Sequence, residues 1–190
     1  AIRLGVSANS VRTEFKKGAT ANPIDDETET AGRSAEENRP RPPVPEWWLL
    51  RLALQYEEHI EWVWTHLDLE WISHETVRQI MASRFAAVSE WHGLAHWLNE
   101  IEDPYARQLV TEAVADQREI PDPEKVLKGA PGTHGVVQIL RDKYIDRQLA
   151  GLTRRMSDPS LNQTELIELT TRKMQLLQLK RQPLQPLGEI

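Results

Sequence analysis

The 190-residue sequence contains no cysteine, so it can form neither a disulfide framework nor a thiolate metal site. It has no run of 18 apolar residues, which argues against a transmembrane helix, and no basic start followed by an apolar stretch, as a signal peptide would have. Segments of alternating apolar and polar residues, typical of β-strands, are missing as well. Together these absences predict an all-α protein without membrane contact, and they favour the cytoplasm.

Catalytic and phosphate-binding motifs are also missing. The sequence has no G-x-x-x-x-G-K-[ST] or G-x-G-x-x-G phosphate loop and no G-x-S-x-G nucleophile turn. His92 and His96 have the i, i+4 spacing of a helical zinc site, with Glu100 one turn further. However, Gly93 stands where an H-E-x-x-H motif needs glutamate, and Trp97 indicates a core-facing helix. We therefore expect no catalytic residue, no metal and no cofactor in this chain.

The charge of the chain is unevenly distributed. The net charge is −6, which argues against strong nucleic-acid binding by the whole chain. Residues 139–183 nevertheless carry nine basic and five acidic residues, for a net charge of +4. This basic segment indicates either a contact surface or a solvated helix face of mixed sign. The seven tryptophans are interleaved with glutamates that repel phosphates, so we expect them in a core or a protein interface.

Composition divides the chain into five parts. Residues 1–17 predict a helix and a half, too little to bury a core alone, at the end of a preceding domain. Residues 18–44 are polar, contain few large apolar side chains and include R-P-R-P-P, so we expect a disordered linker. A flexible linker of roughly 26 residues would have a root-mean-square end-to-end distance of about 25–30 Å. A helical bundle follows over 45–138, then a long helix with a C-terminal helical hairpin over 139–182, and a tail over 183–190.

Local signals place the helix starts in the bundle. Pro45 suits a first helical turn, and the segment that follows is apolar nearly all round, which predicts a central helix covered on several sides. Ser73, Asp103 and Asp122 are the expected N-cap residues of three later helices.

The C-terminal segment predicts two long helices joined by a short turn. The first carries apolar residues at helical spacing over more than 20 residues, and the second begins at a capping box formed by Asn162 and Glu165. So short a turn requires the helices to run antiparallel. Such a thin hairpin either protrudes and offers an apolar strip to a partner or folds back onto the bundle.

The order of these parts resembles the C-terminal part of bacterial DnaG-type DNA primases. The resemblance rests on L-G-V-S-x-x-x-V-R-x-E-F near the start, the acidic linker, P-E-W-W-L-L-R-L-A-L, and the closing stretch LAGLTRRMSDPSLNQTELIELTTRKMQLLQL. It implies that the zinc-binding and polymerase domains lie upstream, so that this fragment is not itself an enzyme although its parent chain is a DNA primase. It further implies that residues 139–182 dock on the N-terminal domains of the hexameric replicative helicase during DNA replication, as part of the primosome.

By this resemblance the hairpin supplies the helicase contacts. The candidate helicase-binding residues lie on or near its turn and faces: Leu152, Arg155, Leu161, Glu165, Leu169, Arg172, Lys173 and Leu176. The seven tryptophans and the lack of a basic patch in the bundle depart from the family's pattern. A further contact with single-stranded-DNA-binding protein, which the resemblance also raises, therefore stays open.

Two other functions compete with this one. Residues 1–17 contain A-x-x-L-G-V-S-x-x-S-V-R, which partly matches a helix-turn-helix and would indicate a DNA-binding regulator. A steep salt dependence in a DNA-mobility assay would favour that function. The hairpin could instead serve a helical scaffold that self-associates, in which case the mass would depend on concentration.

Overall fold

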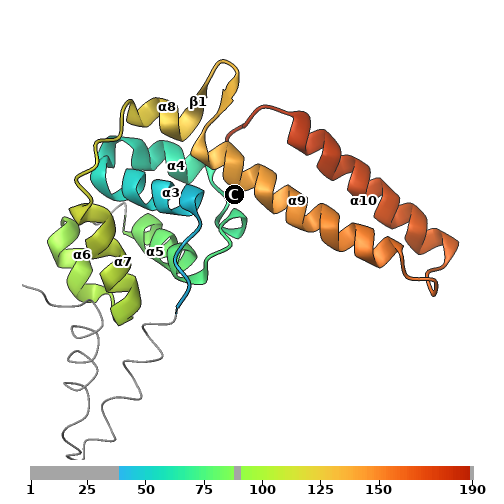
Figure 1. Cartoon of the computed structure of the whole chain (residues 1–190), viewed down its shortest axis with the longest axis horizontal. Helices are drawn as coiled ribbons and strands as arrows, with labels where there is room; N and C mark the ends of the chain where they lie inside the picture. The colour runs from blue at the N-terminus through green and yellow to red at the C-terminus, as the bar shows by residue number, and fades with distance from the viewer. Residues whose placement is uncertain (1–38, 88–90, 189–190) are drawn as a thin grey trace, which may run out of the picture. The chain divides into compact units, whose positions relative to one another are not determined.

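The computed structural model describes residues 39–87 and 91–188, so the predictions for residues 1–17 and for most of the linker lie outside the described residues. The described part is all-α, as predicted (Figure 1). Its helices and short turns are α3 (Val44–Gln55), η1 (Glu57–His59), α4 (Ile60–His66), η2 (Leu69–Trp71), α5 (Glu75–Ala86), α6 (Leu94–Glu100), α7 (Pro104–Ala115), α8 (Pro123–Lys128), α9 (Val136–Met156) and α10 (Gln163–Arg181). No helix among these residues is long and apolar enough to cross a membrane.

Helix α3 is the centre of the bundle. Four of its side chains, Leu49, Leu50, Leu52 and Ala53, have no exposed surface. The helix packs against α5, α7, α8 and α9, which explains why its sequence is apolar nearly all round. The predicted central helix is therefore confirmed, with Pro45 in its first turn.

Side-chain caps begin three of the helices where the sequence predicts them. Asp103 accepts a hydrogen bond from the backbone of α7, and Asp122 accepts one from the backbone of α8. Asn162 and Glu165 form both hydrogen bonds of a capping box at the start of α10. These caps satisfy backbone N–H groups that have no partner within the helix.

The predicted N-cap at Ser73 is wrong. The N-cap of α5 is His74, whose Nδ1 accepts a hydrogen bond from the Val77 backbone N–H at 3.3 Å. Ser73 instead donates both its hydroxyl and its backbone N–H to Oε1 of Glu46, at 2.5 and 2.8 Å. Since Glu46 is only 2% exposed, its buried carboxylate competes successfully for the serine hydroxyl.

A tight connection between α8 and α9 contains the two strands that the sequence did not predict. Strands β1 (Gly129–Ala130) and β2 (Thr133–His134) pair antiparallel over two residues each. Gly129 has a positive φ of 89°, and a Cβ on Gly135 would lie 2.3 Å from the Leu127 carbonyl oxygen. Strands this short carry no detectable alternation, so the glycines are the usable signal for this turn.

Helices α9 and α10 lie side by side and form the predicted hairpin at the C-terminal end of the bundle (Figure 1). Helix α9 has 21 residues, in agreement with the expected length above 20. Its first half packs on α3, α8 and η2, and Val136, Val137 and Leu140 belong to the bundle core. The remainder of α9 packs against α10. One continuous helix therefore belongs to both the bundle and the hairpin.

Candidate protein-docking surface

The apolar candidate residues of the hairpin lie mainly in its interior. Leu169 and Leu176 on α10 are 9% and 5% exposed, and the helix packs chiefly against α9. Leu152 on α9 and Leu161 in the turn are half-buried. We call these two buried leucines of α10, Leu169 and Leu176, the seam. The seam leucines hold the two helices together and are not free to contact a partner.

The polar candidate residues divide into two groups. Arg155 and Arg172 are exposed and Lys173 is half-buried, so their charges remain close to solvent. Glu165 is instead engaged in the capping box: its Oε2 accepts the Asn162 backbone N–H at 3.0 Å, while Asn162 Oδ1 accepts the Glu165 N–H at 2.9 Å. Glu165 therefore has a structural role at the start of α10.

The opposite side of α10 carries exposed apolar side chains that were not among the candidate residues. Ile167 is 59% exposed and Met174 is 63% exposed, and at 100° per residue they lie across the helix from the seam leucines. Thr170, Thr171 and Gln178 share their side. We call these five residues the outer face of α10. None of these five residues is charged, and Arg181, the last residue of α10, lies on the same side of the helix.

The two threonines make the outer face more apolar than its sequence suggests. The Thr170 hydroxyl donates to the Leu166 carbonyl at 2.7 Å, and the Thr171 hydroxyl donates to the Ile167 carbonyl at 2.9 Å. Since these hydroxyls bond to the helix's own backbone, the threonines contribute mainly methyl groups to the surface. Leu166, at 41% exposed, extends the apolar area on one side.

The spacing of apolar residues in α10 contained a signal for this face. Leu169 and Leu176 are seven residues apart and account for one buried stripe. Ile167 and Met174 are also seven residues apart but fall on a second stripe, displaced by about half a turn. A helix with apolar residues on two sides has a surface to offer beyond its own partner helix.

The turn of the hairpin is fixed by an aspartate. Oδ1 of Asp158 accepts the backbone N–H of Ser160 at 2.9 Å and its hydroxyl at 2.7 Å. These two hydrogen bonds, the backbone bond first, lower the pKa of Asp158. Arg154 and Arg155 lie in the last turn of α9, where positive charge is favourable next to the free carbonyls of the helix end.

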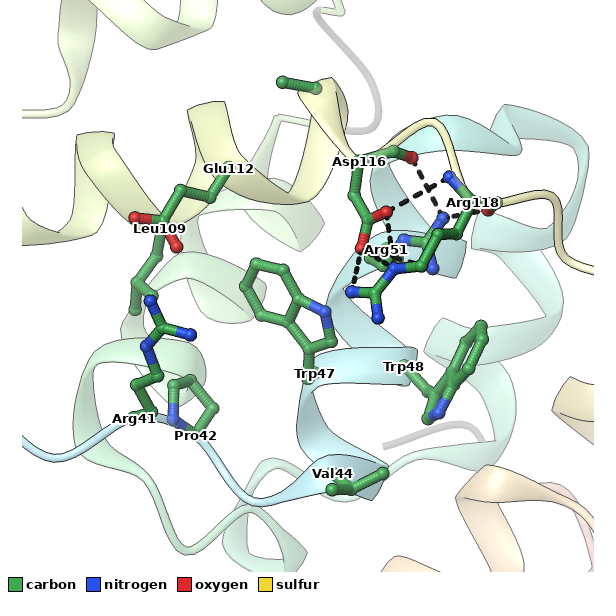
Figure 2. A pocket seen from close by; sticks show the side chains of 11 residues that line it. Arg41, Pro42, Val44, Trp47, Trp48, Arg51, Leu109, Glu112, Asp116 and Arg118 are labelled. Carbon is green, nitrogen blue, oxygen red and sulfur yellow. Dashed lines mark hydrogen bonds and ion pairs between the residues drawn. The ribbon is translucent and has the colours of Figure 1, made fainter. Parts of the chain in front are cut away.

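A cavity of about 580 Å³ lies between the start of α3 and α7 (Figure 2). Trp47 and Trp48 form part of its wall, and Arg51 closes one end. Arg51 donates to the backbone carbonyl of Asp116 at 3.0 Å, and Arg118 forms an ion pair with the Asp116 carboxylate at 2.6 Å. The hydrogen bond from the Arg118 side chain is the largest cause that holds the pKa of Asp116 well below its usual range.

The charged groups that line this cavity are arginines and carboxylates. Its lining contains no histidine, cysteine, serine, threonine or lysine, and its two carboxylates are those of Glu112 and Asp116. The charged groups at its closed end are already paired with one another. The network joins the C-terminal end of α7 to α3 and so has a structural explanation.

The described residues hold no group of three or more histidine, cysteine, aspartate or glutamate side chains that could bind a metal ion. His92 and His96 lie with ring centroids 5.4 Å apart, edge to face, and Nδ1 of His96 is 3.4 Å from Oε1 of Glu100. Among the described surfaces, the outer face of α10 is therefore the best candidate for recognition of another molecule.

No protein-family model, curated protein or solved structure matches this chain at a significant level.

Proposed function

We propose that this chain is a non-catalytic docking module whose C-terminal hairpin binds the N-terminal domains of a hexameric replicative DNA helicase. Docking tethers the catalytic domains of the parent primase at the replication fork, in the cytoplasm, and raises their local concentration there. The choice of the helicase as partner rests on the resemblance of the closing sequence, Leu149 to Leu179, to the final hairpin of DnaG-type primases.

The observation that carries the docking function is the outer face of α10. Ile167 and Met174 are more than half exposed, although each would gain free energy from burial. An apolar stripe on one side of a helix is suited to insertion into a groove between helices of a partner. The five residues are too few for an obligate interface, which suits a reversible contact.

Three basic side chains lie in the second half of α10: at 100° per residue Arg181 lies beside the outer face, whereas Arg172 and Lys173 lie nearer the seam. Arg172 and Arg181 on α10 are exposed, and Lys173 is half-buried. Exposed charges of this kind contribute more to the orientation and rate of association than to affinity. We therefore expect apolar contacts of the outer face to supply most of the binding free energy, and Arg181 to favour an acidic group on the partner beside that face.

The experiment is light-scattering mass determination on a sizing column, with the chain mixed with its cognate replicative helicase at tens of micromolar. We expect the chain to elute with the helicase hexamer. Met174→Asp should abolish co-elution because it puts a charge in the apolar contact. Gln148→Asp, which adds the same charge at an exposed position of α9, is the matched control and should co-elute like the unmodified chain.

Three outcomes would count against the proposal in different ways. Failure of the unmodified chain to co-elute would exclude the helicase as partner. Co-elution that survives Met174→Asp would remove the outer face from the contact. A doubled mass of the chain alone, lost in Met174→Asp, would show that the outer face serves self-association instead.

A further inference from the structure

The segment after α10 runs back to the bundle (Figure 1). Helix α10 ends at Arg181, and the half-buried Leu184 then packs against the bundle core. Further along, the backbone N–H of Leu187 donates to the carbonyl oxygen of Thr65, in the last turn of α4, at 2.7 Å. Residues 182–188 therefore connect the end of the hairpin to a helix of the bundle.

A buried arginine holds the start of this segment. Arg141 on α9 is only 3% exposed, and its Nη2 donates to the Gln182 carbonyl at 2.8 Å. Its Nη1 donates to the Pro183 carbonyl at 3.3 Å, and Asp142 lies 3.3 Å from the same guanidinium. A buried guanidinium requires such partners, because a charge without them is costly to remove from water.

The rest of the hairpin gives α10 few other attachments. Its two buried side chains, Leu169 and Leu176, both lie in the seam with α9. The ion pair between Lys180 and Asp146, at 2.5 Å, involves partly exposed side chains, and such pairs contribute little to stability. Apart from residues 182–188, α10 therefore depends chiefly on its packing against α9.

We propose that residues 182–188 form a strap that fixes the α9–α10 hairpin at one angle to the bundle, with Arg141 as its fastening point. The strap gives the hairpin a second connection to the bundle, in addition to the continuous helix α9. It holds the outer face of α10 in a defined direction, and its release lets α10 separate from α9. This role does not depend on which partner the outer face binds.

The sequence of the strap suits this role. Pro183 and Pro186 fix two backbone φ angles in an otherwise irregular segment. Fewer conformations are then lost when the strap is in place, so a short segment with one packed leucine and a few hydrogen bonds can stay attached. A proline also lacks the N–H group that would need a partner at these positions.

The absence of native cysteine allows a direct test. Spin labels at Ala82→Cys on α5 and Gln175→Cys on α10, both exposed, report the distance between bundle and hairpin by pulsed dipolar spectroscopy. In the whole chain we expect one narrow distance distribution. In a variant that ends at Arg181, which lacks the whole strap, we expect at least a doubling of the width of this distribution and at least tenfold faster amide hydrogen exchange in the last two turns of α10.

Two further variants make the outcome decisive. Leu184→Ala keeps the chain length and both carbonyl acceptors of Arg141, and should broaden the distribution in the same direction. Gln185→Ala, at an exposed position of the strap, should leave width and exchange unchanged. Unchanged width and exchange in both the shortened chain and Leu184→Ala would overturn the proposal. If the shortened chain also loses protection in α5, its bundle is destabilised as a whole. The width and exchange measured for Leu184→Ala then decide whether the proposal stands.

Discussion

Leu169 and Met174 should respond very differently to truncation, because one lies in the seam and the other on the outer face. Leu169→Ala removes a side chain that is about nine-tenths buried between α9 and α10. Met174→Ala shortens one that is 63% exposed. Both are apolar residues of the same helix, five positions apart, so helix propensity contributes little to the comparison.

The expected size of the difference follows from burial. Leucine-to-alanine changes in closed cores cost about 2–5 kcal/mol, and the seam, covered by α9 alone, belongs at the low end, near 2 kcal/mol. This corresponds to a roughly 30-fold rise in the equilibrium constant for separating α10 from α9. Exposed substitutions stay within about 0.5 kcal/mol, so Met174→Ala should change that constant by less than about threefold.

Native-state hydrogen exchange measures this equilibrium directly, because the α10 amides exchange when the helix separates or frays. We expect Leu169→Ala to speed exchange in the middle of α10 about 30-fold while α3 and α5 stay protected. Met174→Ala should leave the amide exchange rates of α3, α5 and α10 close to those of the unmodified chain. Equal acceleration by the two variants would refute the division of α10 into a seam and an outer face.

Three other predictions concern the bundle and its connection to the hairpin. Glu46→Gln should lower the free energy of unfolding by about 2 kcal/mol, because a buried carboxylate that accepts three hydrogen bonds loses its charge. Urea denaturation measures this free energy, and an unchanged value would contradict the role assigned to Glu46. Gly135→Ala should destabilise the chain, because the new Cβ would clash with the Leu127 carbonyl. Gly151→Ala, which has open space around it in mid-helix, should stabilise α9 by about 0.5–1 kcal/mol, so that calorimetry shows the two melting temperatures moving in opposite directions. The pKa of Asp116 is lowered in the folded chain, so the stability it contributes is complete above about pH 4 and is lost as the pH falls further; thermal melts from pH 5 to pH 2.5 should show a smaller decrease for Asp116→Asn, and equal decreases would count against this pairing.

Local sequence signals predicted the parts of the fold that local physics determines. The capping residues Asp103, Asp122 and Asn162 act on backbone N–H groups two or three residues away, so their pattern is readable without tertiary structure. The apolar periodicity of α9 likewise gave its length. Ser73 failed as an N-cap because its hydroxyl bonds to Glu46, 27 residues earlier, and local pattern carries no information about such a contact.

The docking surface was only partly predictable for the same reason. Choosing residues by their position on the hairpin selected Leu169 and Leu176, which α9 covers. Which of two apolar stripes on α10 faces α9 depends on how the helices pack, although the second stripe at Ile167 and Met174 was visible in the spacing. The carbonyl groups bound by Arg141 belong to the backbone, so no residue pattern indicated the strap.

The most direct test of the docking function is the affinity of the labelled chain for its cognate helicase, measured by fluorescence anisotropy. We expect saturable binding that weakens at least tenfold in Ile167→Asp and in Met174→Asp, and less than twofold in Gln148→Asp. Equal affinities for the two outer-face variants and the control would contradict the proposed surface, and the absence of binding by the unmodified chain at tens of micromolar would contradict the proposed partner.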